Sequence, residues 1–444
     1  MHIDLTKGST KSHLIKLSIP SITGYFFHTM FNVTDTFFAG AVSTEALAAL
    51  SLSASIFFMV LAIAIGMSEA LTVLVGNSFG EKKLKNAQNT ALNGIVLAFV
   101  LSFLLTTISI VTIPYLIALL ADASYINQTM SYINIILYAT LFFIASFFFN
   151  ALLVAIGDTK SFRNILIFTS FLNILLDYIF IHTLNFGVEG IAFATVVSEF
   201  VTMFYLFYKL QKTKLWIGFK NFTLDIAVLK ELIKQGFAPS MNMFMMAFGM
   251  YIITYFVAPY GKEAVAGFGI GMRIEQIFLI PVVGLGIGTL SIVSQNSGAQ
   301  LFTRIQETIK LAIRYGFYLS TLGILAFYTI GEEITSLLSK SKIVQESALL
   351  YLHICGFAFY GFVIIFIYIS MLQGIKKTGI IFPISIYRQV IAPIILFSFF
   401  SLLHVEIYIL WLGLDAIIFS SAFYLWWYAK NLQYTKEKIK DEDE

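Results

Sequence analysis

Residues 14–21 read Leu-Ile-Lys-Leu-Ser-Ile-Pro-Ser, and residues 232–240 read Leu-Ile-Lys-Gln-Gly-Phe-Ala-Pro-Ser. Two further stretches recur at the same spacing: Glu-Ala-Leu-Ala (45–48) as Glu-Ala-Val-Ala (263–266), and Val-Gly-Asn-Ser-Phe-Gly (75–80) as Val-Ser-Gln-Asn-Ser-Gly (293–298). A chain that repeats itself in this way is built from two related halves. The fold is therefore expected to be a duplication.

The composition is that of a membrane protein. Hydrophobic residues make up 58% of the 444 positions and charged residues 12%, and the mean hydropathy is +0.85. Apolar runs of about 20 residues, the length that crosses a hydrocarbon core, recur from end to end. We predict an all-α polytopic protein with twelve spans: 14–38, 46–74, 90–117, 130–156, 162–184, 188–208, 232–257, 264–296, 308–331, 348–373, 380–403 and 406–429.

Several classes of function are disfavoured. Cys355 is the single cysteine, which rules out an internal disulfide and a cysteine cluster for zinc or iron–sulfur. The chain lacks a GxxxxGK[ST] loop, so ATP is not expected to drive it. It shows no clustered nucleophile, metal set or acid–base pair. We expect neither an enzyme nor a bound cofactor. A passive channel stays open on composition alone.

The distribution of basic residues predicts the orientation. Most of the 28 Lys and Arg residues, among them Lys82, Lys212, Arg304 and Lys377, fall on one side if the N-terminus is cytoplasmic. We therefore expect a multi-pass protein of a cytoplasmic-type membrane with both termini in the cytoplasm. The basic excess is explained by topology and gives no support to nucleic-acid binding. The first apolar run is too long and too polar for a cleaved signal peptide.

The predicted domains follow the duplication: an N-terminal six-helix bundle (1–208), a cytoplasmic linker (209–231), a C-terminal six-helix bundle (232–430) and a cytoplasmic tail (431–444). Six spans return the chain to its starting side, so both halves share one orientation, as in transporters built from parallel repeats. In such folds the substrate site lies between the halves. We expect a monomer, and we expect the tail from Lys436 to Glu444 to be disordered.

Acidic residues inside the spans are the strongest functional signal. A carboxylate at mid-membrane costs at least about 2.5–3.5 kcal/mol, so it usually has a function or a partner. Asp35 and Asp177 lie at similar distances from the outer ends of spans one and five. Asn173 shares a helix face with Asp177, and Thr195 reaches a comparable depth in span six. Their oxygens suit Na⁺, and a buried carboxyl group can also take a proton. The alternative is a satisfied polar network that joins helices.

The second half serves as an internal control for the first. Matching Pro20 with Pro239 places Thr254 opposite Asp35, and matching Thr159 with Thr378 places Ala392 and Leu396 opposite Asn173 and Asp177. If the carboxylates only joined helices, the second half should need them as well. We predict a cation site in the first half.

Other residues are weaker candidates. Lining of a substrate cavity is one interpretation, and ordinary packing the other, for His28, Asn32, Met243, Met246, Met250 and Arg273. His28 and Asn32 share a helix face with Asp35, and flexible thioethers adapt to varied apolar ligands. The charged residues whose roles stay open are Glu69, Glu199, Glu275, Arg388 and Asp415.

The chain resembles the multidrug and toxic compound extrusion (MATE) antiporters over nearly its full length. The resemblance rests on Asp35 with Ala39-Gly40, on Gly-Asn-Ser-Phe-Gly at 76–80, on Gly-Met-Arg-Ile at 271–274, on Ser-Gln-Asn-Ser-Gly-Ala at 294–299 and on Asn-Ile-Leu-Leu-Asp at 173–177. It implies a V-shaped pair of bundles that exports organic, often cationic and lipophilic, compounds against inward H⁺ or Na⁺ flow. Small-molecule drugs and the lipid bilayer are the partners that it implies.

The resemblance also implies which branch of the family applies. In one branch the cation site lies in the first bundle, at residues that match Asp35, Asn173, Asp177 and Thr195. Another branch uses acids in spans seven and ten, where this sequence has none. Related flippases of lipid-linked saccharides share the plan and remain the alternative, but they line the cavity with several basic residues. Only Arg273 and Arg388 would be available here.

Overall fold

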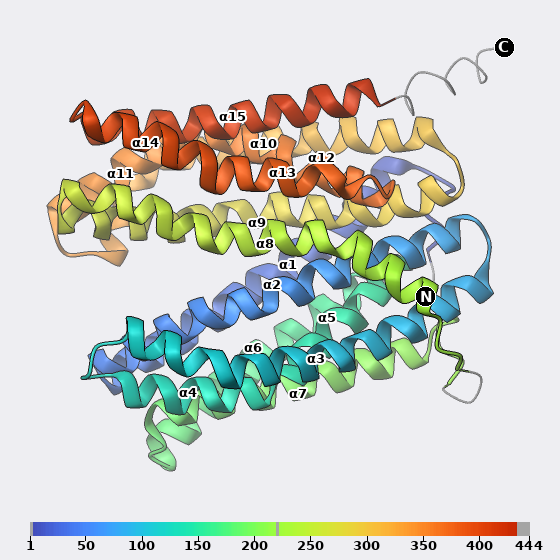
Figure 1. Ribbon diagram of the computed structural model, residues 1–444, viewed down its shortest axis with the longest axis horizontal. Helices are drawn as coiled ribbons and strands as arrows, with labels where there is room; N and C mark the ends of the chain where they lie inside the picture. The colour runs from blue at the N-terminus through green and yellow to red at the C-terminus, as the bar shows by residue number, and fades with distance from the viewer. Residues whose placement is uncertain (1–2, 219–221, 433–444) are drawn as a thin grey trace. The chain divides into compact units, whose positions relative to one another are not determined.

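The structure is a computed structural model that describes residues 3–218 and 222–432 (Figure 1). Over these residues the chain is helical throughout and contains no β-strand. Nine of its helices are long and apolar enough to cross a membrane, or eleven if each of two bent helix pairs is one span. Helix α1 is long enough, but its polar side chains keep it out of this set. The prediction of an all-α polytopic membrane protein is confirmed.

The first half of the chain forms helices α1 to α7. Their bounds are α1 Thr10–Val42, α2 Thr44–Gly80, α3 Leu84–Leu120, α4 Ile126–Tyr138, α5 Thr140–Ala155, α6 Lys160–Tyr178, the π-helix η1 Ile179–Thr183, and α7 Gly187–Gln211. The helices α2 and α3 each contain 37 residues and are about 55 Å long at 1.5 Å per residue. They therefore extend well beyond the roughly 30 Å of a hydrocarbon core.

The second half repeats this order. Its bounds are α8 Ile226–Val257, η2 Ala258–Tyr260, α9 Lys262–Gly298, α10 Phe302–Leu338, α11 Lys342–Cys355, α12 Ala358–Gly374, η3 Thr378–Ile380, α13 Ile381–Ile386, η4 Tyr387–Ile391, α14 Ala392–Leu402 and α15 Ile407–Asn431. Helices α9 and α10 again contain 37 residues each. The pair α4 and α5 is bent by 47°, and its counterpart, α11 and α12, by 55°. The duplication thus preserves helix lengths and bends.

The turns repeat as well. Positive φ angles are rare for residues with a side chain, yet they recur at matching places in the two halves. Lys82 (58°) corresponds to Gln300 (59°), Gly157 (82°) to Lys376 (59°), and Asn185 (56°) to His404 (49°). Each pair is separated by 218 or 219 residues, the spacing of the sequence repeats. The two halves therefore share these backbone turns although the two residues differ in each of the three pairs.

Contacts divide the chain into two compact units, and each half contributes to both. Among the described residues, unit 1 contains residues 3–4 and Ile19–Met243, and unit 2 contains Leu5–Ser18 together with residues 244–432. The first turns of α1 thus belong to the second unit, and the first half of α8 belongs to the first.

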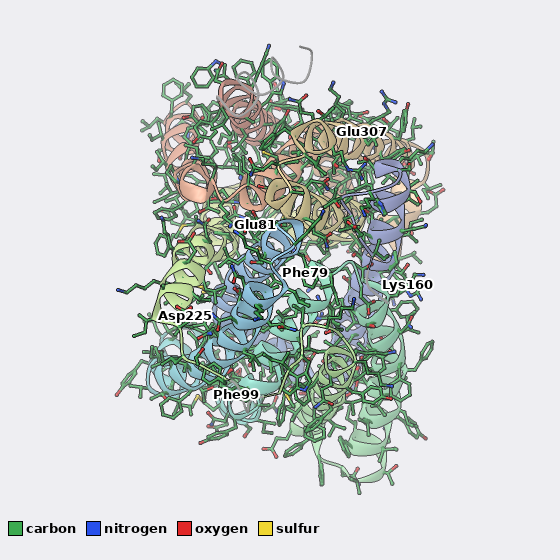
Figure 2. All side chains as sticks on the ribbon, turned by 90° about the vertical axis from the view of Figure 1, so that its right-hand side faces the viewer. Phe79, Glu81, Phe99, Lys160, Asp225 and Glu307 are labelled. Atoms are coloured by element: carbon green, nitrogen blue, oxygen red, sulfur yellow. The ribbon has the colours of Figure 1, made fainter. Side chains whose placement is uncertain are left out.

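Hydrogen bonds hold these exchanged segments within their units. In unit 2, Arg304 on α10 donates to the carbonyl oxygens of Leu5 and Gly8 at 3.1 and 2.8 Å. In unit 1, Asn89 on α3 donates to the Asp225 carboxylate at 2.9 Å, and the Asp225 amide donates to Asn93 at 2.9 Å. Asp225 also accepts a hydrogen bond from the Ala227 amide and so caps α8. Asp225 is labelled in Figure 2.

Packing is close where α8 crosses α2 within unit 1. A Cβ atom added to Gly66 would lie 2.1 Å from the backbone nitrogen of Ser240, so only glycine fits there. The Ser240 hydroxyl donates to the Ile63 carbonyl at 2.8 Å across the same contact. On the outside, large apolar side chains such as Phe99 remain exposed (Figure 2), as expected of a surface that faces lipid. The helices α2 and α8 are thus in close contact inside unit 1, whereas the outer surface of this unit carries exposed apolar side chains.

Candidate cation site

Asp35 lies in the interior of unit 1 and is 4% exposed. It comes from α1 and accepts a hydrogen bond from the Thr195 hydroxyl of α7, with 2.9 Å between Oγ1 and Oδ2. The same hydroxyl lies 3.0 Å from the Ile191 carbonyl oxygen of its own helix. The fold thus joins two of the predicted site residues that are 160 positions apart in the sequence.

Asn173 and Asp177 complete the cluster from α6, and both are 0% exposed. They lie one helical turn apart on the same face, and the side chains of both interact with Asp35. The structure therefore brings together all four residues that the sequence predicted: Asp35, Asn173, Asp177 and Thr195. They are supplied by three helices, α1, α6 and α7.

Several oxygens of this cluster lack a hydrogen-bond donor. Among the described residues, none donates to Oδ1 of Asp35, to Oδ1 of Asn173 or to either carboxylate oxygen of Asp177. Buried polar atoms are nearly always hydrogen-bonded, so such atoms need a further partner. Two neighbouring carboxyl groups, an amide oxygen and a hydroxyl oxygen form a set of oxygen ligands that fits Na⁺, and the carboxyl groups can bind a proton instead. Among residues 3–218 and 222–432, no three His, Cys, Asp or Glu side chains lie close enough together to form a transition-metal site.

Tyr132 of α4 is a further member that the sequence analysis missed. It is buried, and it interacts with Thr195, Asp35 and Asp177. A signal for it was present in the duplication, because Tyr351 stands 219 residues further along and also lies beside a carboxyl group. An uncharged tyrosine is ordinary in an apolar span, and helical spacing relates residues of one helix only, so neither pattern indicates Tyr132.

The cluster ends at a break in helix geometry. The π-helix η1 begins at Ile179, two residues after Asp177, and continues to Thr183. Such π-helical turns are rare and are frequent at functional sites. In this segment His182 packs against Phe38 of α1, with 6.3 Å between ring centroids. The helix that carries Asn173 and Asp177 is thus locally widened next to the helix that carries Asp35.

The predicted cavity residues lie outside this cluster. Asn32 is exposed and donates to the carbonyl of His28 on its own helix at 3.0 Å, while the His28 ring packs against Tyr25. Met243 belongs to unit 1 and is partly buried. The remaining residues, which belong to unit 2 and are partly buried or exposed, are Met246, Met250 and Arg273.

Unit 2 also contains two buried carboxyl groups, those of Glu275 and Asp415, which are referred to below as the Glu275 pair. Glu275 of α9 accepts a hydrogen bond from the hydroxyl of Tyr351 on α11 and interacts with Asp415 of α15. Asp415 interacts with the Cys355 thiol, and its Oδ1 has no hydrogen-bond donor among the described residues. Glu275 forms no ion pair with any residue that the structure describes, so it is not paired with Arg273.

Because of this pair, both halves of the chain contain buried carboxyl groups. The positions equivalent to Asp35, Asn173 and Asp177 hold no acid, and Thr254 bonds to the Met250 carbonyl of its own helix at 2.8 Å. Unit 2 nevertheless has two buried carboxyl groups, one of which accepts a hydrogen bond from Tyr351, the counterpart of Tyr132. They come from helices other than the equivalents of α1 and α6. Comparison of aligned positions alone could not show this.

Comparisons with known proteins agree with this architecture. The sequence profile of the MatE family matches residues 20–179 and again residues 239–398. A probable multidrug resistance protein NorM of Thermotoga maritima is 27% identical over 76% of this chain and 75% of its own length. The multidrug export protein MepA of Staphylococcus aureus is 22% identical over 76% of this chain. An FAD transporter of Shewanella oneidensis is 25% identical over 80% of both chains.

Solved structures show the same fold. A MATE crystal structure in complex with MaL6 superposes with a TM-score of 0.91 at 22% identity and covers 96% of this chain and 97% of its own. A multidrug resistance MATE family transporter in an outward-facing conformation gives a TM-score of 0.91 over 97% of both chains at 22% identity. The family model matches both halves of the duplicated sequence, and the solved structures have the same arrangement of helices. The chain belongs to the MatE family of membrane transporters.

Proposed function

We propose that this protein exports organic compounds from the cell and draws the energy from inward movement of H⁺ or Na⁺ through the site at Asp35. The observation that carries the proposal is the cluster of Asp35, Asn173, Asp177 and Thr195 in the interior of unit 1, with several oxygens that lack a donor. We further propose that the protein belongs to the branch of the family whose cation site lies in the N-terminal bundle, and the same cluster supports this proposal.

The physical reason is electrostatic. Among the described residues, neither Asp35 nor Asp177 forms an ion pair with a basic side chain. Two buried carboxylates without a counter-charge repel each other and are poorly solvated. A proton or a sodium ion removes this penalty, so the ion stabilises the arrangement in which α1, α6 and α7 bring the four residues together. A ligand that binds one conformation more tightly shifts the population towards it, which is what coupling requires.

The residues of this site would act as follows. Asp35 and Asp177 supply the negative charge, Asn173 supplies an amide oxygen, and Thr195 orients Asp35 through its hydroxyl group. If the coupling ion is Na⁺, these oxygens are its ligands; if it is H⁺, the two carboxyl groups carry it. No cofactor and no ATP take part in this scheme.

The substrate class follows from the relatives rather than from the site. Several relatives are named as multidrug export or resistance proteins, and one as an FAD transporter. We therefore propose that the substrates are small organic compounds such as drugs, often cationic and lipophilic as the resemblance to the family implies. We also propose a monomeric transporter in a bacterial cytoplasmic membrane, with both termini in the cytoplasm. The alternative is transfer of a lipid-linked saccharide by the same fold.

Transport by purified protein in liposomes tests the proposal. A cationic dye is loaded, and a proton gradient and a sodium gradient are imposed separately. We expect efflux to follow at least one of the gradients and to fall to background in Asp35→Asn. Thr254→Ala, which alters the equivalent position of the second half, is the matched control and should keep efflux near the wild-type level. Efflux of equal rate with both gradients collapsed would overturn the coupling, and transfer of a lipid-linked saccharide without dye efflux would favour the alternative.

A further inference from the structure

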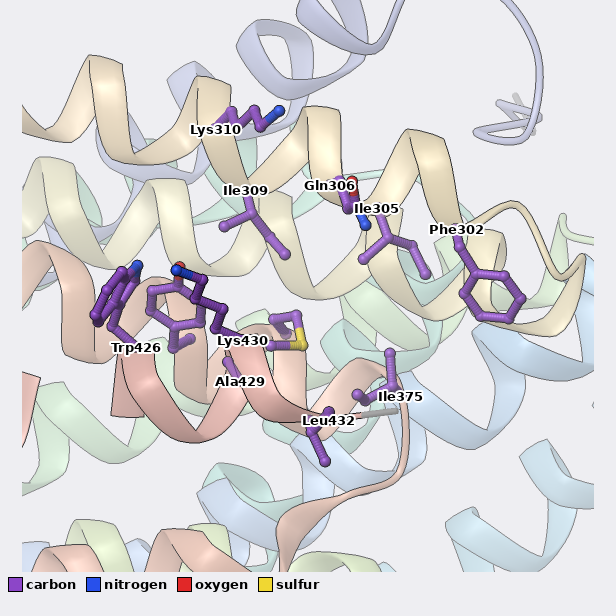
Figure 3. A pocket seen from close by; sticks show the side chains of 12 residues that line it. Phe302, Ile305, Gln306, Ile309, Lys310, Ile375, Trp426, Ala429, Lys430 and Leu432 are labelled. Carbon is purple, nitrogen blue, oxygen red and sulfur yellow. The ribbon is translucent and has the colours of Figure 1, made fainter. Parts of the chain in front are cut away.

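A groove lies on unit 2 where three of its helices approach one another. Its walls come from the first turns of α10, the end of α12 and the last turns of α15, and its volume is about 260 Å³ (Figure 3). Neither the Asp35 cluster nor the Glu275 pair contributes to it. The transport scheme proposed above does not use it.

The walls of the groove are apolar. Ile305 and Ile309 follow each other by one turn of α10, and Ile375, Ala429 and Leu432 also line the groove (Figure 3). Met371 of α12 also contributes to the lining. This surface suits hydrocarbon chains and offers little to a small hydrophilic ligand.

The rim carries positive charge. Lys310 of α10 and Lys430 of α15 both line the groove, and the Lys430 ammonium lies 5.1 Å from the centre of the Trp426 ring. Lys310 forms no ion pair or hydrogen bond with any residue that the structure describes. Gln306, one turn before Lys310, adds an amide group to the same rim. An apolar groove with a cationic edge is complementary to an anionic amphiphile.

The position of the groove points to the source of that amphiphile. It lies at the end of unit 2 at which α10 begins and α12 and α15 end, and Arg304, Lys376 and Lys377 lie at the same helix ends. By the distribution of basic residues this end faces the cytoplasm. Basic pockets between helices on that side are known to hold anionic lipid headgroups, and tryptophan favours the interface between headgroups and chains.

We propose that this groove binds one anionic phospholipid of the cytoplasmic leaflet. Its headgroup lies at the rim to which Lys310 and Lys430 contribute positive charge, the Trp426 ring lies at the level of the headgroup, and its acyl chains run along Ile305 and Ile309. A free phosphate ion would use the lysines alone and leave the apolar walls without a ligand. A zwitterionic lipid would use the walls but gain less from the two lysines.

Native mass spectrometry of the full-length protein, released from detergent after titration with lipid, tests this inference. The probes are phosphatidylglycerol, phosphatidylcholine and glycerol 3-phosphate. We expect the wild type to prefer phosphatidylglycerol and Lys310→Gln/Lys430→Gln to bind it at least about tenfold more weakly, since each lysine near an anionic headgroup contributes about a fivefold effect. Lys377→Gln, at the same end of unit 2 but outside the groove, is the control and should bind as the wild type does.

Three results would overturn the proposal. One is equal binding of phosphatidylglycerol and phosphatidylcholine, and another is an equal loss in Lys377→Gln and in the double variant. The third is binding of glycerol 3-phosphate as tight as that of the lipid. All the lysines that are changed are exposed, so gel filtration should show the variants folded.

Residues 441–444, Asp-Glu-Asp-Glu, lie outside the described residues, and binding of this acidic segment in the groove is an outcome that the test has to distinguish. A full-length variant with these four side chains changed to their amides distinguishes the two. Unchanged or stronger lipid binding supports the lipid site, whereas loss of lipid selectivity would show that the tail rather than the groove sets it.

Discussion

Thr195 and Asp415 occupy the same position in two helices of equal length. Each stands eight residues after the first residue of a 25-residue helix, α7 from Gly187 and α15 from Ile407. Thr195 donates a hydrogen bond to Asp35, and Asp415 interacts with Glu275. Both units thus have a buried polar residue at this helix position. In unit 2 this residue carries a carboxyl group itself, whereas in unit 1 it is a threonine that contacts a carboxyl group from another helix.

Asp177→Asn should abolish ion-driven export, because it removes one of the two charges that the ion neutralises. We expect a loss of at least about tenfold in the rate of dye efflux, the scale of a 1.4 kcal/mol change. Leu396→Ala, at the equivalent position of the second half, is the matched control and should change the rate less than about threefold. The measurement is efflux under an imposed ion gradient, normalised to the amount of folded protein. Equal losses in the two variants would contradict a site in unit 1.

Thr195→Ala should weaken the binding of the coupling ion rather than stop transport. It removes the hydroxyl group that holds Asp35 in place, and one such hydrogen bond is worth about 1 kcal/mol, or roughly fivefold in affinity. The ion concentration that gives half-maximal efflux should rise by this factor while the maximal rate changes little. Thr195→Ser keeps the hydroxyl and should restore the wild-type value. If serine fails to restore it, the methyl group and not the hydrogen bond is responsible.

Tyr351→Phe should destabilise unit 2, because Glu275 loses its donor and remains buried. Leaving a buried polar group without its partner costs about 1–3 kcal/mol. We expect a lower midpoint of thermal unfolding in detergent, together with a smaller effect of Glu275→Gln when it is combined with Tyr351→Phe than in the wild type. Additive effects of the two substitutions would show that the pair does not interact in solution. Tyr360→Phe, at an exposed hydroxyl pair with Thr321, is a suitable control.

Gly66→Val should prevent α2 and α8 from packing within unit 1. Even a Cβ atom at this position would overlap the Ser240 backbone, which cannot move without shifting the helix. Overpacking of this kind costs about 1–3 kcal/mol or more, and we expect aggregation or a broad gel-filtration profile. Gly269→Val is the matched control, because no atom lies within 4 Å of its added Cβ. A normal profile for both variants would contradict the close contact.

Much of the candidate site could be predicted from the sequence. Carboxylates inside apolar helices are costly, so Asp35 and Asp177 stand out in any membrane span, and helical periodicity places Asn173 beside Asp177. Thr195 followed from its depth and from the resemblance to the family. Tyr132 did not follow, because a tyrosine in an apolar span is unremarkable until its neighbours from other helices are known.

The duplication and the helical membrane fold could be read from the chain itself, because hydropathy and internal repetition are properties of the sequence. Which polar residues meet was settled by the packing of the helices. Aligned positions identify Thr254 as the counterpart of Asp35, but a buried carboxyl group can reach an equivalent place from any helix that lines it, as Glu275 and Asp415 do. The same holds for the groove at Lys310 and Lys430, two lysines 120 positions apart that the packing of α10 and α15 places along one groove. Contacts between helices depend on their packing, and spacing along one helix carries no information about it.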